Sequence, residues 1–163
     1  MQNSPIVAEK RRLFVVFFVV FLAFLAAPAT LAGAATSTEA GLLRAVNSAR
    51  AAHGLRPFRL DATLVRAARS HSREMLLGNY FEHGDFRGRM LAFKVRGAVA
   101  GENLAWGTGS YAEARTIVAE WLASPEHRAN LLHPGFQRIG IGLVRGTFLG
   151  NGGATIVTAD FAG

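Results

Sequence analysis

The chain has 163 residues, a formal net charge of +7 and no cysteine, and half of its residues are hydrophobic. The lack of cysteine excludes a disulfide framework, while the modest charge and the lack of a nucleotide-binding glycine loop argue against a nucleic-acid partner. Lysine occurs only at Lys10 and Lys94, so the basic residues are nearly all arginines. These arginines are either ordinary surface charges or a surface that binds planar acidic groups such as phosphates.

The first segment has the pattern of a secretory signal. Three basic residues precede an apolar block over 13–27, and an A-x-A cleavage motif ends at Ala34. We therefore predict a signal peptide over 1–34, although 13–34 is long enough to stay uncleaved as a membrane anchor. In both cases 35–163 forms a single domain that is secreted, periplasmic or extracellular. The missing disulfides favour a bacterial protein.

Helical periodicity recurs in four places after the signal. The predicted helices cover residues 36–54, 61–78, 110–122 and 124–133. Capping boxes of the S/T-x-x-E type are expected to open the first and third helices, and Asp61 and Ser124 are expected to cap the other two. His71 lies on the apolar line of the second helix, so it is predicted to be a hydrogen-bonded histidine at the edge of the core.

Strand patterns follow at the C-terminal end. Residues 139–143 alternate apolar side chains with Gly140 and Gly142, and 156–161 supply a final strand. Glycines inside a strand usually permit close approach of another element, so the sheet is expected to be tightly covered. Residues 84–100 are predicted to be a long loop. The elements together predict an α+β fold in which helices cover a small antiparallel sheet.

The segment from Gly101 to Leu132 concentrates polar chemistry among aromatic residues within about one helix-loop-helix unit. Its polar and aromatic residues are Glu102, Asn103, Trp106, Trp121, His127 and Asn130. A carboxylate, a histidine and two amides gathered in this way predict a cleft.

Six pieces in the right order resemble the CAP superfamily: cysteine-rich secretory proteins, antigen 5 and pathogenesis-related 1 proteins, here in the cysteine-free, SCP-like extracellular bacterial branch. They are Asn47-Ser48-Ala49-Arg50, Ala68-Arg69-Ser70-His71-Ser72-Arg73-Glu74-Met75, Phe81-Glu82-His83, Gly101-Glu102-Asn103-Leu104-Ala105, Trp121 with His127-Arg128-Ala129-Asn130-Leu131-Leu132, and Ile139-Gly140-Ile141-Gly142. The resemblance implies a three-layer α-β-α sandwich with a central cleft that binds ligands.

The resemblance also identifies candidate site residues. In many family members the cleft holds two histidines and two glutamates, which His83 and Glu102 match in part. Ser124 stands where the second glutamate is usual, and residues 153–158 do not reproduce the motif of the last histidine, so the tetrad is incomplete. His127 belongs instead to an S-x-x-H-R motif. The candidates for ligand binding are His83, Glu102, Asn103, His127 and Arg128.

Metal binding and acid-base chemistry are both open for these residues. His83, Glu102 and His127 could supply three zinc ligands, but no H-E-x-x-H helix or close ligand pair supports a divalent cation. Without metal, a glutamate that orients a histidine could form a general base.

Each candidate also has a structural interpretation. Glu102 and Asn103 could bond exposed backbone in an irregular segment, and Ser124 is explained better as a helix cap than as a nucleophile. Arg128 and Asn130 could fix neighbouring loops. Trp106 and Trp121 are expected to pack in or near the core.

Three function classes remain. The first, which we favour, is a binding module with a His/Glu cleft for lipid, sterol or cell-wall glycan. The second is a metal-assisted or acid-base hydrolase of peptide or wall material, and the third is a structural or interaction protein of the envelope. Membrane contact is expected only through the N-terminal segment or an arginine-rich surface. The sequence carries no signal for an oligomeric state.

Overall fold

A computed structural model gives the fold of residues 37–163. The predicted signal peptide or anchor at 1–34 lies outside the described residues. Between residues 37 and 163 there is no helix with the length and apolar character needed to cross a membrane.

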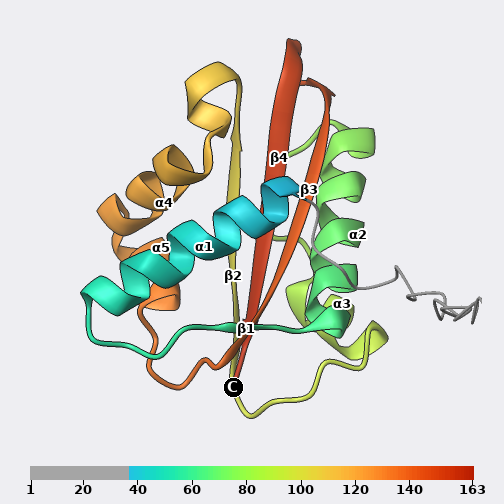
Figure 1. Ribbon diagram of the computed structural model, residues 1–163. Helices are drawn as coiled ribbons and strands as arrows, with labels where there is room; N and C mark the ends of the chain where they lie inside the picture. Colours follow the sequence, from blue (N-terminus) through green and yellow to red (C-terminus); the bar gives the residue numbers. More distant parts are fainter. Residues whose placement is uncertain (1–36) are drawn as a thin grey trace, which may run out of the picture.

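The described chain contains helices and strands, and it ends with two consecutive strands (Figure 1). The helices are α1 (Ser37–Ala52), α2 (Ala62–Gly78), α3 (Phe86–Ala92), α4 (Ala114–Ala123) and α5 (Pro125–Leu131), with a short 3-10 helix η1 (Gly109–Ala112). The strands are β1 (Arg59–Leu60), β2 (Ala100–Gly107), β3 (Arg138–Phe148) and β4 (Asn151–Ala162).

The strands form one sheet in the order β1-β3-β4-β2. The three longer strands are antiparallel, as the sequence predicts. The two-residue strand β1 adds a parallel pairing at one end, so the sheet is mixed. Strand β2 lies at the other end, and within residues 37–163 one of its edges therefore has no strand beside it.

Helices cover both faces of the sheet, with α1, α4 and α5 on one side and α2 and α3 on the other (Figure 1). Strand β4 shows why. Val157 and Phe161 pack with α1 and α4, while Ile156 and Ala162 pack with α2 or α3, because alternate side chains of a strand point to opposite faces. The predicted α+β fold with a three-layer sandwich is confirmed.

Gly140 and Gly142 of β3 allow α2 to lie directly on the sheet. A Cβ atom at Gly140 would overlap the backbone of Leu64, and one at Gly142 would overlap the backbone of Ala68. The tight covering predicted from these glycines is present. Ser72 adds a polar tie by donating to the Gly142 carbonyl at 3.0 Å.

The region predicted to be a loop over 84–100 contains a helix, so that prediction is wrong. Asp85 caps α3 by accepting from the Gly88 backbone N–H at 2.8 Å, and Met90 is buried against α2. The helix has only seven residues, which is too short for an apolar period to stand out.

The helix-loop-helix interpretation of 101–132 is also wrong, because Glu102 and Asn103 lie on strand β2 and not in an irregular segment. The polar side chains concealed the strand pattern. Helix α4 begins at Ala114, after the 3-10 helix, and Glu113 makes no side-chain cap, so the capping box predicted at Ser110 and Glu113 is absent.

The other caps differ in outcome. Asp61 caps α2 as predicted, by accepting from the backbone N–H groups of Thr63 at 2.8 Å and Leu64 at 3.1 Å. The capping box of the first helix cannot be placed, because Thr36 lies outside the described residues. Glu39 is buried and forms an ion pair with Arg69 of α2.

We predict that Gly142→Ala lowers the free energy of unfolding by about 3 kcal/mol, because the added methyl group forces α2 away from β3. Gly152→Ala is the matched control, since a Cβ atom there meets nothing within 4 Å. Denaturant unfolding of both variants measures the difference. Equal stability of the two would contradict the close packing.

Candidate functional site

Glu102 is the centre of the polar site. Its side chain is only 2% exposed, and a buried carboxylate needs partners to compensate its charge. Its Oε1 accepts from His83 Nδ1 at 2.7 Å, and its Oε2 forms an ion pair with Arg89 of α3 and lies 4.0 Å from His71 Nε2. These contacts join α2, α3 and the segment between them to the sheet.

His83 is the exposed member of the pair, with 57% of its side chain open to solvent. Because Glu102 accepts the Nδ1 proton, the neutral ring presents an unprotonated Nε2. That nitrogen can take up a proton or bind a ligand. The structure thus brings His83 and Glu102 into direct contact.

His71 is buried beside this pair. Its Nε2 lies 2.9 Å from the Glu82 carbonyl, which can only accept, so Nε2 carries a proton. Its Nδ1 lies 3.5 Å from the carboxylate of Glu74. His71 therefore holds the chain that carries His83 against α2.

His127 approaches from the opposite face of the sheet and is half-buried. Burial, followed by repulsion from nearby His83, lowers the pKa of His127, while Glu126 acts in the opposite sense. The neutral ring is favoured. Ser124 stands at the N-cap position of α5, but its side chain makes no cap; instead its Oγ lies 3.0 Å from His127 Nδ1. The predicted capping bond of Ser124 is therefore wrong.

Asn103 and Asn130 tie β2 to α5. Asn103 is fully buried and donates to the His127 carbonyl at 2.9 Å. Asn130 donates to Asn103 Oδ1 and to the Glu102 carbonyl, both at 3.0 Å. Arg128 is exposed and lies 3.3 Å from His53 Nε2, beyond the end of α1. Asn103 is therefore buried between β2 and α5, and Arg128 lies at the surface next to His53.

A hollow of about 460 Å³, which we call the edge cleft, follows the outer edge of β2. It is lined in part by Phe81, Trp106, Tyr111, Glu120, Ser124 and His127. The Trp106 ring packs edge-on against Phe148, with centroids 5.5 Å apart. Trp121 is buried and donates to the Leu104 carbonyl at 2.9 Å, so it supports the wall from the core.

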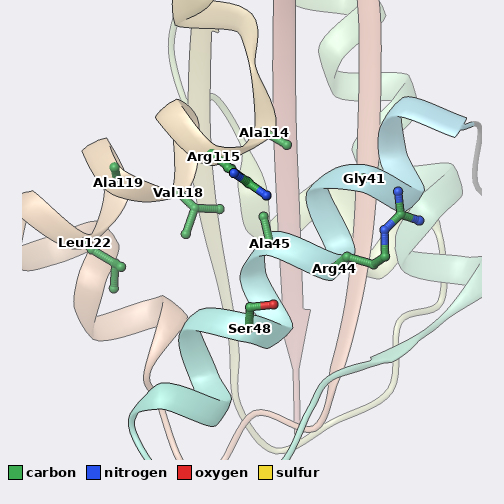
Figure 2. Close-up of a pocket in the computed structure, with 9 residues that line it drawn as sticks. All are labelled: Gly41, Arg44, Ala45, Ser48, Ala114, Arg115, Val118, Ala119 and Leu122. Atoms are coloured by element: carbon green, nitrogen blue, oxygen red, sulfur yellow. The ribbon is translucent and has the colours of Figure 1, made fainter.

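A second hollow of about 540 Å³, the helix groove, lies between α1 and α4 (Figure 2). Sequence reasoning missed it. The signal was present on α1, where the small residues Gly41, Ala45 and Ser48 recur at helical spacing and leave room beside α4. Arg44 and Arg115 border the groove.

The candidate metal ligands His83, Glu102 and His127 do not form a metal centre as arranged here. Nowhere in residues 37–163 are three side chains of the histidine, cysteine, aspartate or glutamate types placed to hold an ion. Both Glu102 oxygens are already engaged, by His83 and by Arg89. The donor set therefore fits a buried ion pair better than a zinc site.

Asp160 is a site residue that sequence reasoning missed, although it interrupts an apolar strand. It lies on β4 directly opposite Glu102 and is fully buried. Neither of its oxygens has a fixed donor. Burial, and then the nearby Glu102 charge, raise the pKa of Asp160 well above 3.8, while Arg89 opposes this. A proton on Asp160 lets it donate to Glu102, which no pair of ionised carboxylates can do.

We predict that Asp160→Asn raises the melting temperature by several degrees at pH 7 and above, and has little effect near pH 4. The raised pKa means that the native state keeps a proton which the unfolded chain releases. In the parent protein, the stability that protonated Asp160 contributes is therefore complete below the unfolded pKa and is lost as pH rises through the folded pKa. Asparagine does not ionise, so the variant does not suffer this loss. Thermal unfolding from pH 4 to 9 measures it. A variant that is less stable at every pH would show that Asp160 is ionised.

Two comparisons of sequence connect the chain with known proteins. The family model of the cysteine-rich secretory protein family, CAP, matches residues 43–161. The uncharacterized protein YkwD of Bacillus subtilis (strain 168) is 36% identical over 111 residues, which are 65% of this chain and 42% of that protein. The uncharacterized membrane protein YlbC of the same organism is 32% identical over 115 residues, or 68% of this chain and 32% of that protein. The chain spans less than half the length of these relatives.

Solved structures share the fold. An extracellular protein with an SCP domain from Bacillus anthracis superposes with a TM-score of 0.63 at 28% identity, covering 74% of this chain and 38% of that one. An outer surface protein of Borrelia burgdorferi gives 0.61 at 21% identity, covering 80% and 99%, and shows the fold alone. The motifs, the fold and the match over residues 43–161 agree, and the chain belongs to the cysteine-rich secretory protein (CAP) family.

Proposed function

We propose that this protein is an exported binding module of the bacterial envelope or secretome, and that it holds an amphipathic lipid with an acidic head group in the helix groove. The signal pattern of 1–34 supports export, as does the extracellular SCP-domain protein of Bacillus anthracis among its structural relatives. The observation that carries the binding proposal is the groove itself, an apolar trough with arginines at its border (Figure 2).

The groove matches the two parts of such a lipid. Ala45, Val118 and Leu122 provide an apolar surface for a hydrocarbon chain. Arg44 and Arg115 are exposed, and within residues 37–163 neither pairs with a carboxylate. A guanidinium group binds a carboxylate or phosphate through paired hydrogen bonds, so the head group would lie at the border of the groove.

The edge cleft is the alternative location for the ligand. Its exposed aromatic rings, Phe81 and Tyr111, and the partly exposed Trp106 suit the flat face of a sterol or a sugar ring. Sugars usually require several hydrogen-bonding side chains, whereas Glu120, Ser124 and His127 are the main polar groups here. The cleft therefore fits a sterol-like ring better than a wall glycan.

A second candidate function is acid-base hydrolysis at His83. The specific observation in its favour is the contact with Glu102, which holds His83 Nδ1 at 2.7 Å and orients the ring. His83 Nε2 would then take a proton from an attacking water.

We predict that, if peptide, ester or wall material is hydrolysed, His83→Gln lowers the rate at least about 100-fold with unchanged melting temperature. Unchanged turnover in this variant would reject the mechanism.

We predict that Ala45→Trp weakens fatty-acid binding at least about tenfold, because the indole fills the groove. Displacement of a fluorescent fatty acid from the full-length protein measures the affinity. The Arg44→Glu/Arg115→Glu double variant should lose a similar factor for the acid but little for the matching fatty alcohol, since charged hydrogen bonds contribute about 1.5–3 kcal/mol.

Arg73→Glu is the control, because Arg73 is exposed on α2, across the sheet from the groove. It should bind like the parent. Parent-like binding by Ala45→Trp and by the double arginine variant would reject the groove as the lipid site. Loss of binding in Phe81→Ala and Tyr111→Ala instead would move the site to the edge cleft.

A further inference from the structure

A third hollow lies at the end of the sheet where α1 gives way to β1. Its volume is about 450 Å³, and we call it the arginine hollow. The residues that line it include Arg50, Arg56, Arg59, Phe136 and Gln137. Neither the helix groove nor the edge cleft shares any of these residues.

Arg50 supplies a buried positive charge to this hollow. It is 2% exposed, and its guanidinium lies 3.8 Å from the centroid of the Phe58 ring. It donates to the carbonyls of Arg56 and Leu131, both at 2.8 Å, and of His133 at 3.3 Å. A carbonyl carries only a partial charge, so the charge of Arg50 is hydrogen-bonded but not neutralised.

The same hydrogen bonds make the walls rigid. Arg50 connects the turn after α1, through Arg56, to the last residue of α5, Leu131, and to His133 just beyond it. A site whose backbone is already fixed loses less conformational entropy when a ligand binds. The hollow is therefore preorganised around its buried cation.

Two exposed cations complete the hollow. Arg56 and Arg59 are exposed, and within residues 37–163 neither forms an ion pair or a side-chain hydrogen bond. The nearest acidic residue in sequence, Asp61, is engaged by Arg138 at 2.8 Å and caps α2. Three guanidinium groups thus face one hollow, and among the described residues no carboxylate lines it.

We infer that the arginine hollow is a phosphate-binding site, separate from the lipid groove. The guanidinium groups of Arg56 and Arg59 and the Gln137 amide together offer more donors than the two oxygens of a carboxylate can use, whereas a phosphate group accepts through at least three oxygens. Arg56 and Arg59 bind the phosphate directly, and the buried positive charge of Arg50 adds electrostatic attraction. The phosphate belongs either to a small soluble phosphoester or to a lipid head group.

The test uses the full-length protein and three probes: pyrophosphate, glycerol phosphate, and vesicles of phosphatidylcholine with or without phosphatidylglycerol. Calorimetry measures the soluble probes and co-sedimentation measures the vesicles, all at one fixed salt concentration. The Arg56→Gln/Arg59→Gln variant should bind the recognised probe at least about tenfold more weakly. The Arg66→Gln/Arg73→Gln variant removes the same charge from exposed positions on α2 and should bind within about twofold of the parent.

The probes separate the two sources of phosphate. Binding of glycerol phosphate or pyrophosphate without vesicle binding assigns a soluble phosphoester, and binding of phosphatidylglycerol vesicles that the Arg56→Gln/Arg59→Gln variant loses assigns a lipid head group. Equal losses in the two double variants would show that net charge alone attracts anions and would overturn the site. Absence of binding to every probe at millimolar concentration would also overturn it. The lipid groove is tested separately by fatty-acid displacement, and these variants leave its Arg44 and Arg115 unchanged.

Discussion

The buried carboxylate of Glu102 is the constraint on which the polar cluster around it depends. A charge at 2% exposure is tolerated only with close partners, and these come from α2, α3 and the segment between them. The ion pair with Glu102 holds Arg89 of α3 against the sheet, whereas His83 stays at the surface. Asp160 adds a second carboxyl to the same strand pair, and its proton makes the two compatible.

The two faces of the sheet consequently have different roles. On the α2 side His83 and Arg89 compensate the charge of Glu102, and α2 lies too close to β3 at Gly140 and Gly142 to leave a hollow between these two elements. On the other side the small residues of α1 leave the helix groove, and Arg50 leaves an unneutralised charge in the arginine hollow. In our account the cluster around Glu102 supports the fold, and open surfaces elsewhere bind ligands.

Local patterns in the sequence were sufficient to predict several elements of the fold. The caps and apolar lines indicated α2 and the two C-terminal strands, and Gly140 and Gly142 correctly predicted a close helix. Strand β2 was missed because Glu102 and Asn103 are polar on opposite faces. Their partners lie far away in the chain, such as Asn130 and Asp160, and no local pattern shows them. The helix groove and the arginine hollow were missed for the same reason, since each needs two elements side by side.

The most direct test of this account is a map of amide chemical-shift changes in the full-length protein as a long-chain fatty acid is added. We expect the largest changes at Ala45, Val118 and Ala119, on the facing sides of α1 and α4, with His83 and Trp106 nearly unchanged. Changes centred on His83 and Trp106 would contradict the account and return the binding site to the edge of β2.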